Sequence, residues 1–119
     1  MSVEASLFTV LGPLVGNRVF PDNAPLTTTK PYIVYQQIGG KVIVPLGKDI
    51  PDKQNARMQI MCWATTRLAS KALSLQVEDA LRTSAVFLSA NPEAACVAVN
   101  EPDLGIYGSA QDFTIWYAR

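Results

Sequence analysis

The sequence predicts an α+β domain in which a mainly antiparallel β-sheet is packed on one face by a long α-helix, with a short helix at the N-terminus. Three observations lead to this fold class. Apolar and polar residues alternate along several segments, as they do in half-buried strands. One long segment has apolar residues at helical spacing. Strand-like segments both precede and follow that helix in the sequence. At 119 residues the chain has the length of one domain, residues 1–119.

The N-terminal segment predicts a short helix that begins after Ser2 and ends near Leu11. The Ser2 hydroxyl is suited to cap the first turn. Leu7, Val10 and Leu11 then follow at the spacing of one helical face, and the Gly-Pro pair after Leu11 ends the helix. Residues 18–20 are expected to form a short extended piece before a proline-containing loop.

Two strands are predicted with particular clarity in the first half of the chain. Tyr32–Ile38 is rich in β-branched and aromatic residues, and two glycines end it. Ala56–Ala64 alternates strictly, which predicts that its even-numbered residues face the core and its odd-numbered residues the other side. Trp63 is therefore predicted to face away from the core, and the alternation in a later strand predicts the same for Trp116. Either a partner protein or the chain itself covers these two indoles.

A long helix is predicted from a cap at Thr65 or Thr66 to about Thr83. Its apolar stripe comprises Ala69, Ala72, Leu73, Val77, Ala80 and Leu81. A connection containing Phe87 and Leu88 follows, and two more strands are expected over 95–99 and 111–117. In the last strand Phe113, Ile115 and Tyr117 are predicted to face the core.

Residues 40–55 interrupt the sheet pattern. Val42–Val44 is strand-like, whereas Pro45, Gly47, Pro51 and alternating charges predict that Leu46–Asn55 is a projecting loop. The segment is longer than a tight hairpin turn and too polar for a core, so it is suited to act as an interaction arm. The candidate residues on this arm are Lys48, Asp49 and Lys53.

Charge is distributed unevenly, although the 10 basic and 10 acidic residues give no net charge. Residues 30–77 hold seven basic and two acidic side chains, and residues 78–119 hold two basic and six acidic ones. Two oppositely charged regions allow copies of the chain to associate head to tail, or they neutralise each other within one molecule. The candidate interface residues are Arg57, Arg67 and Lys71 on the basic side and Glu101, Asp103 and Asp112 on the acidic side.

The composition argues against catalysis and indicates neither a cofactor nor a metal. The chain has no histidine, which removes Ser-His and Cys-His catalytic pairs and the commonest metal ligand. Cys62 and Cys96 are far apart in sequence and lack the spacing of zinc or redox motifs. The glycine pairs do not have the spacing of a phosphate-binding loop. The N-terminus lacks the features of a signal peptide, and no apolar stretch is long enough to cross a membrane.

Several segments together resemble the tail-completion, or head–tail joining, proteins of tailed bacteriophages and prophages. The resemblance begins at Leu7–Leu11, continues through GNRVFPD at 16–22 and PYIVYQQIGG at 31–40, and includes Ala56–Ala64 and the following helix. It ends in Asp112–Tyr117. These segments occur in the same order over nearly the whole chain.

The resemblance implies a non-enzymatic virion protein with a fold related to tail terminators, assembled in the bacterial cytoplasm. Such proteins cap the tail tube as a ring, commonly a hexamer, and dock it to the head connector. The partners it implies are further copies of the chain, the tail tube protein, and the connector or head-closure protein. A head-closure or tail-tube subunit is an alternative within the same class. The alternative from another class is a small DNA-binding accessory protein, and passive contact with genomic DNA is compatible with either class.

Overall fold

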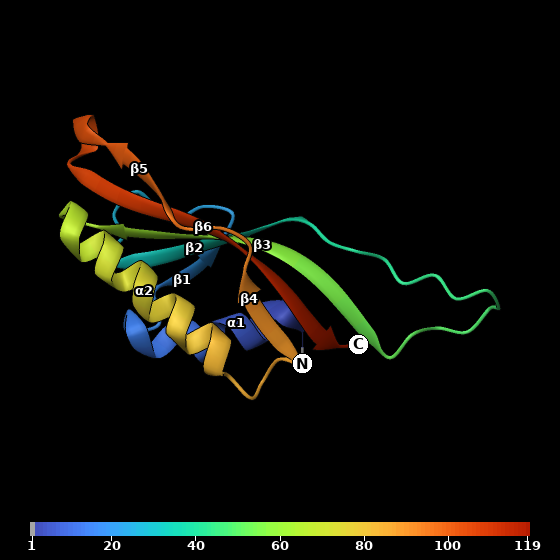
Figure 1. Ribbon diagram of the computed structural model, residues 1–119. Coiled ribbons are helices and arrows are strands. Elements are labelled where there is room, and N and C mark those ends of the chain that lie inside the picture. The colour runs from blue at the N-terminus through green and yellow to red at the C-terminus, as the bar shows by residue number, and fades with distance from the viewer. Residues whose placement is uncertain (1) are drawn as a thin grey trace.

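The computed structural model describes residues 2–119 as two helices and a six-stranded sheet (Figure 1). This arrangement confirms the predicted α+β class. Two single turns of 3-10 helix, Gly12–Leu14 and Pro102–Leu104, complete the secondary structure. The longer elements are α1 Val3–Leu11, β1 Val19–Pro21, β2 Tyr32–Gly39, β3 Lys53–Ala64, α2 Arg67–Thr83, β4 Ser89–Pro92, β5 Val97–Glu101 and β6 Ile106–Ala118.

The sheet is antiparallel except at one edge, where β1 runs parallel to β2. The strand order is β1-β2-β3-β6-β4, and β5 pairs with β6 beside β4. The central pair, β3 and β6, is in register from Lys53 opposite Ala118 to Ala64 opposite Tyr107. β4 pairs with Phe113–Trp116 and β5 with residues 106–110, so these two short strands follow one another along the same edge of β6.

The main core lies between the sheet and the two helices. As predicted, the even-numbered residues of β3 from Ala56 to Cys62 are buried here, and Ala64 is buried as well. Ser2 caps α1 by accepting a hydrogen bond from the backbone N–H of Ala5 at 3.1 Å. Thr66 caps α2 in the same way through the N–H of Ala69. Both predicted helix starts are therefore confirmed.

The buried stripe of α2 differs in part from the predicted one. Leu73, Val77 and Leu81 are buried as expected, but Ala69 and Ala72 are exposed. Their places against the sheet are taken by Ser70 and Ser74. The Ser70 hydroxyl lies 2.8 Å from the carbonyl oxygen of Cys62 and 2.9 Å from Oγ of Ser109, so its polar atom is satisfied in the core.

A smaller apolar cluster lies on the opposite face of the sheet, where Trp63 packs with Val34 and Ile106. Trp63 is buried by the chain itself, which decides between the two sequence interpretations for this residue. Gly108 makes the packing possible, because a Cβ atom there would lie 2.8 Å from the indole ring of Trp63 and 2.7 Å from the carbonyl oxygen of Val99.

The strands differ from the sequence prediction in five respects. Residues 42–44 form no strand, and β3 begins at Lys53 instead of Ala56 because β6 is long enough to pair with it there. The connection after α2 contains the short edge strand β4. β5 begins at Val97, two residues later than expected, and β6 begins at Ile106, five residues earlier than expected.

Candidate functional site

Residues 40–52, which we call the arm, join β2 to β3 and project from one end of the sheet (Figure 1). Most of the arm's apolar side chains are exposed, whereas Ile43 is half-buried. Val42, Val44, Leu46 and Ile50 are all largely exposed. Lys48 and Asp49 lie near the tip and are exposed, whereas Lys53 is the first residue of β3. The structure therefore confirms the projecting loop, now bounded by residues 40 and 52.

Buried Asn55 fixes the direction in which the arm leaves the sheet. Its Oδ1 accepts a hydrogen bond from the backbone N–H of Lys41 at 2.9 Å. Its Nδ2 donates to Oγ1 of Thr114 at 3.0 Å and to the carbonyl oxygen of Ile115 at 3.3 Å. Gly40 passes so close that a Cβ atom there would lie 2.5 Å from the carbonyl oxygen of Asn55. The arm is thus attached to both β3 and β6 at its base.

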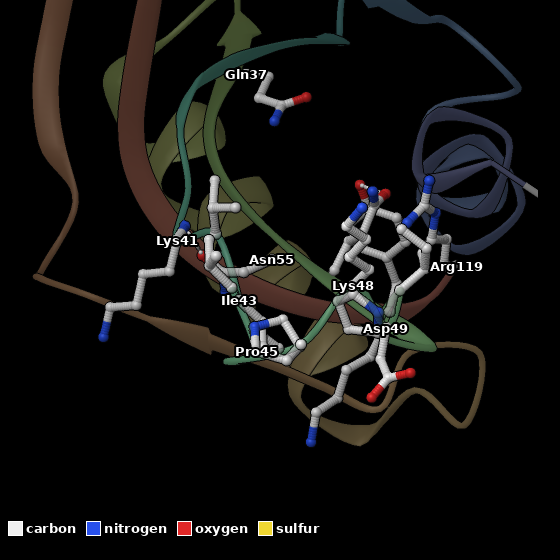
Figure 2. A pocket seen from close by; sticks show the side chains of 16 residues that line it. Gln37, Lys41, Ile43, Pro45, Lys48, Asp49, Asn55 and Arg119 are labelled. Carbon is white, nitrogen blue, oxygen red and sulfur yellow. Dashed lines mark hydrogen bonds between the residues drawn. The ribbon is translucent and has the colours of Figure 1, made fainter.

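A hollow of about 510 Å³ lies between the arm and the C-terminal end of β6 (Figure 2). Figure 2 shows Asn55 beside Lys41 and Ile43 at its edge. The charged residues that line it are Lys41, Lys48, Asp49, Lys53 and Arg119. The backbone N–H of Arg119 donates to the carbonyl oxygen of Asp52 at 2.9 Å, which ties the end of the chain to the returning arm.

Arg57 and Asp112 form an ion pair within one molecule. Nη2 of Arg57 lies 3.1 Å from Oδ2 of Asp112, and Nε lies 2.9 Å from Oε2 of Glu93. For Arg57 and Asp112 the structure therefore favours neutralisation within one molecule over a contact between copies. Sequence reasoning did not select Glu93, because its position beside Arg57 depends on β4, which carries no clear strand pattern.

The other four charged candidates belong to the start of α2 and to the chain around the end of β5, and these parts lie at the end of the molecule opposite the arm (Figure 1). Arg67 and Lys71 are exposed on the first turns of α2. Glu101 is the last residue of β5 and Asp103 lies in the 3-10 turn that follows, and both are exposed. Within residues 2–119 none of the four belongs to an ion pair, so their charges are available to a partner.

The titratable groups of the core are held in their neutral forms. Burial, with a smaller contribution from Cys96, raises the pKa of the Cys62 thiol to about 12, so Cys62 is a protonated thiol at neutral pH. Burial also raises the pKa of Tyr32 and of Tyr35, and for Tyr35 the charges of Glu4 and Asp22 add to the effect.

The described residues contain no cluster of three metal-ligating side chains. Neither helix there has the length and hydropathy needed to span a bilayer.

Comparison with known proteins gives two findings. The model of the family described as "Tail completion protein gp17" matches residues 5–118. A chain from a solved structure titled "Virion of native gene transfer agent (GTA) particle" has a similar fold, with a TM-score of 0.66 and 14% sequence identity. That similarity covers 99% of this chain and 96% of the other. No curated protein matches the sequence significantly.

Proposed function

Because the chain belongs to the tail completion protein gp17 family, we propose that copies of it form a ring that caps the tail tube and joins the tail to the head connector. Family membership makes the chain a structural protein of phage tail morphogenesis. It is located in the tail and neck region of the virion, where it assembles with other virion proteins. The ring, which we propose to be a hexamer, and its direct contacts with the tail tube protein and with the connector or head-closure protein are our inference.

The observation that supports the ring is the separation of two kinds of contact surface. One end of the molecule carries the exposed apolar arm, and the other end carries Arg67, Lys71, Glu101 and Asp103 without partners in the described chain. Different surfaces at the two ends favour a heterologous, head-to-tail contact between copies. Repeating such a contact closes into a ring when its rotation permits. The role is one of assembly, without catalytic turnover.

Reversing the two basic charges tests the ring model. The double variant Arg67→Glu and Lys71→Glu is expected to stay folded, because both side chains are exposed and exposed substitutions change stability by only about 0.5 kcal/mol. Each rim charge contributes ~0–1 kcal/mol to a contact. Reversing two charges at every contact of a ring is therefore expected to prevent closure. Electron microscopy of isolated tails and sedimentation of the purified chain measure the result.

A charge-swapped variant provides the matched control. Adding Asp49→Lys, on the arm end that meets the α2 end in a head-to-tail contact, to the double variant restores an opposite charge across the contact and is expected to recover rings. The ring model would be contradicted if the double variant still formed rings and completed tails as the unchanged chain does. Co-purification of the chain with headless tails supports the cap, and co-purification with isolated heads supports the head-closure role instead.

A further inference from the structure

We infer that the arm of one copy docks in an apolar groove beside α2 of the next copy, an inference that rests on the proposed ring. The groove has a volume of about 440 Å³ and lies between the outer side of α2 and the segment that leads into β5. Leu68 and Leu75 line it, although their side chains are 82% and 61% exposed. Ala95 and Cys96 form the facing wall.

The floor of this groove is rigid and its hydrogen bonds are already satisfied. Gln111 of β6 is buried there, and its Nε2 donates to Oε1 of Glu78 at 3.0 Å and to the carbonyl oxygen of Ala94 at 2.8 Å. Through these two bonds the Gln111 side chain bridges helix α2 and the segment before β5, and it sets the distance between them. The groove is therefore formed before a partner arrives, and the surface it offers is mainly apolar.

The sheet edge next to the groove is also unpaired. β5 pairs with β6 on one side, and no described strand pairs with its other side. Such an edge presents free backbone N–H and C=O groups to an extended segment from another chain. In the register of β5 and β6, Ala98 lies opposite Ser109 on the α2 side of the sheet. An added strand would place alternate side chains over the exposed side of α2.

The arm has the composition that this groove and edge require. Val42, Ile43 and Val44 are β-branched residues with strong strand preference, yet they form no strand in the single chain. Val44 is 82% exposed, and Leu46 beyond it is fully exposed. Asp49, near the tip, has the charge opposite to that of Lys71 on the rim of the groove, and neither residue has an ion-pair partner among the described residues.

The arm and the groove of one molecule do not meet, so the occupant must come from another copy. The arm starts at the Lys53 end of β3, whereas α2 begins just beyond the Ala64 end. β3 alone spans roughly 37 Å at the usual rise per strand residue, and the whole molecule is 53 Å long. The arm points away from α2 (Figure 1). A contact between the arm of one copy and the groove of the next is thus head to tail, as a ring requires.

Native Cys96 allows a direct test, because it lies in the groove while Cys62 is buried in the core. We would introduce Val44→Cys or Leu46→Cys into the arm and treat assembled tails and the concentrated chain with a short bismaleimide. Docking is expected to give a ladder of covalent multimers. The ladder should form at least ~10-fold faster than with Leu26→Cys, which is also fully exposed but lies outside the arm, because docking raises the local thiol concentration.

Adding Cys96→Ser to each arm variant is expected to remove the ladder. A ladder that persists without Cys96 would show that arms contact each other, and cross-linking to the tail tube protein alone would show that the arm binds another partner. Either result overturns the inference, as does the absence of cross-links with both arm variants. Tails that still carry rings and join heads while giving no ladder would overturn arm docking but leave the proposed function intact. Heads that join tails without the chain would overturn the proposed function itself.

Discussion

Replacing Val42, Val44, Leu46 and Ile50 together by serine is expected to abolish head–tail joining while leaving the chain folded. All four side chains are largely exposed in the single chain, so their loss should change the free energy of unfolding by no more than about 0.5 kcal/mol each. In an assembled ring each would contribute about 1.5–3 kcal/mol on burial. Since ~1.4 kcal/mol corresponds to a tenfold change in an association constant, the four substitutions together should lower the association constant of the ring contact by several orders of magnitude.

Particle counts by electron microscopy and infectious titre measure the effect of the four-serine arm. Leu26→Ser combined with Leu88→Ser is the matched control, because these residues are also exposed and apolar but lie outside the arm. The control is expected to give normal particles. Normal joining by the four-serine variant would show that the apolar side chains of the arm take no part in assembly.

Phe113→Ala is expected to lower the free energy of unfolding by about 3–5 kcal/mol, the usual range for truncating a fully buried aromatic residue. Phe113 has no exposed surface and lies on β6 opposite Met58 of β3. Its removal leaves a cavity at the seam between the two longest strands, which the surrounding sheet cannot close without losing register. Urea denaturation followed by circular dichroism measures the change.

Phe8→Ala is the control for the same chemical change. Phe8 lies on α1 and is 43% exposed, so its truncation removes less packing and leaves no enclosed cavity. We expect Phe8→Ala to lower the free energy of unfolding by well under half as much as Phe113→Ala does. Equal losses for the two variants would mean that Phe113 does not occupy the core position described here.

Elements with a strong local pattern were predictable from the sequence. The alternation from Ala56 to Ala64 identified both the strand and its buried face, since a slip of one residue would have exposed every apolar side chain. The sequence predicted the cap at Ser2 and a second cap at Thr65 or Thr66, and the structure shows that Thr66 is the second, since each capping hydroxyl bonds a specific backbone N–H. The arm was recognisable from its prolines and charges.

Features that depend on distant residues were not predictable. β4 is a short edge strand whose partner is the C-terminal half of β6, and nothing local in its sequence SANP favours a strand. Ser70 and Ser74 are both buried, and the Ser70 hydroxyl has hydrogen-bond partners in the core, which helical spacing of apolar residues alone does not show. The pairing of Arg57 with both Asp112 and Glu93 likewise depends on the sheet register.

The same limit applies to the candidate site. Charge counting selected both Arg57 and Arg67, but only the structure separates the ion-paired Arg57 from Arg67, whose charge has no partner in the described chain. Val42–Val44 carries the pattern of a strand without forming one in the single chain. In our account its partner is a second copy, and one sequence cannot show a contact between two molecules.

Electron microscopy of particles assembled without this chain tests the central claim most directly. If the chain caps the tail and joins it to the head, deleting its gene is expected to give filled heads and separate tails, and supplying the chain in trans should restore joined virions. Joined, infectious virions with tails of normal length in the complete absence of the chain would contradict the account.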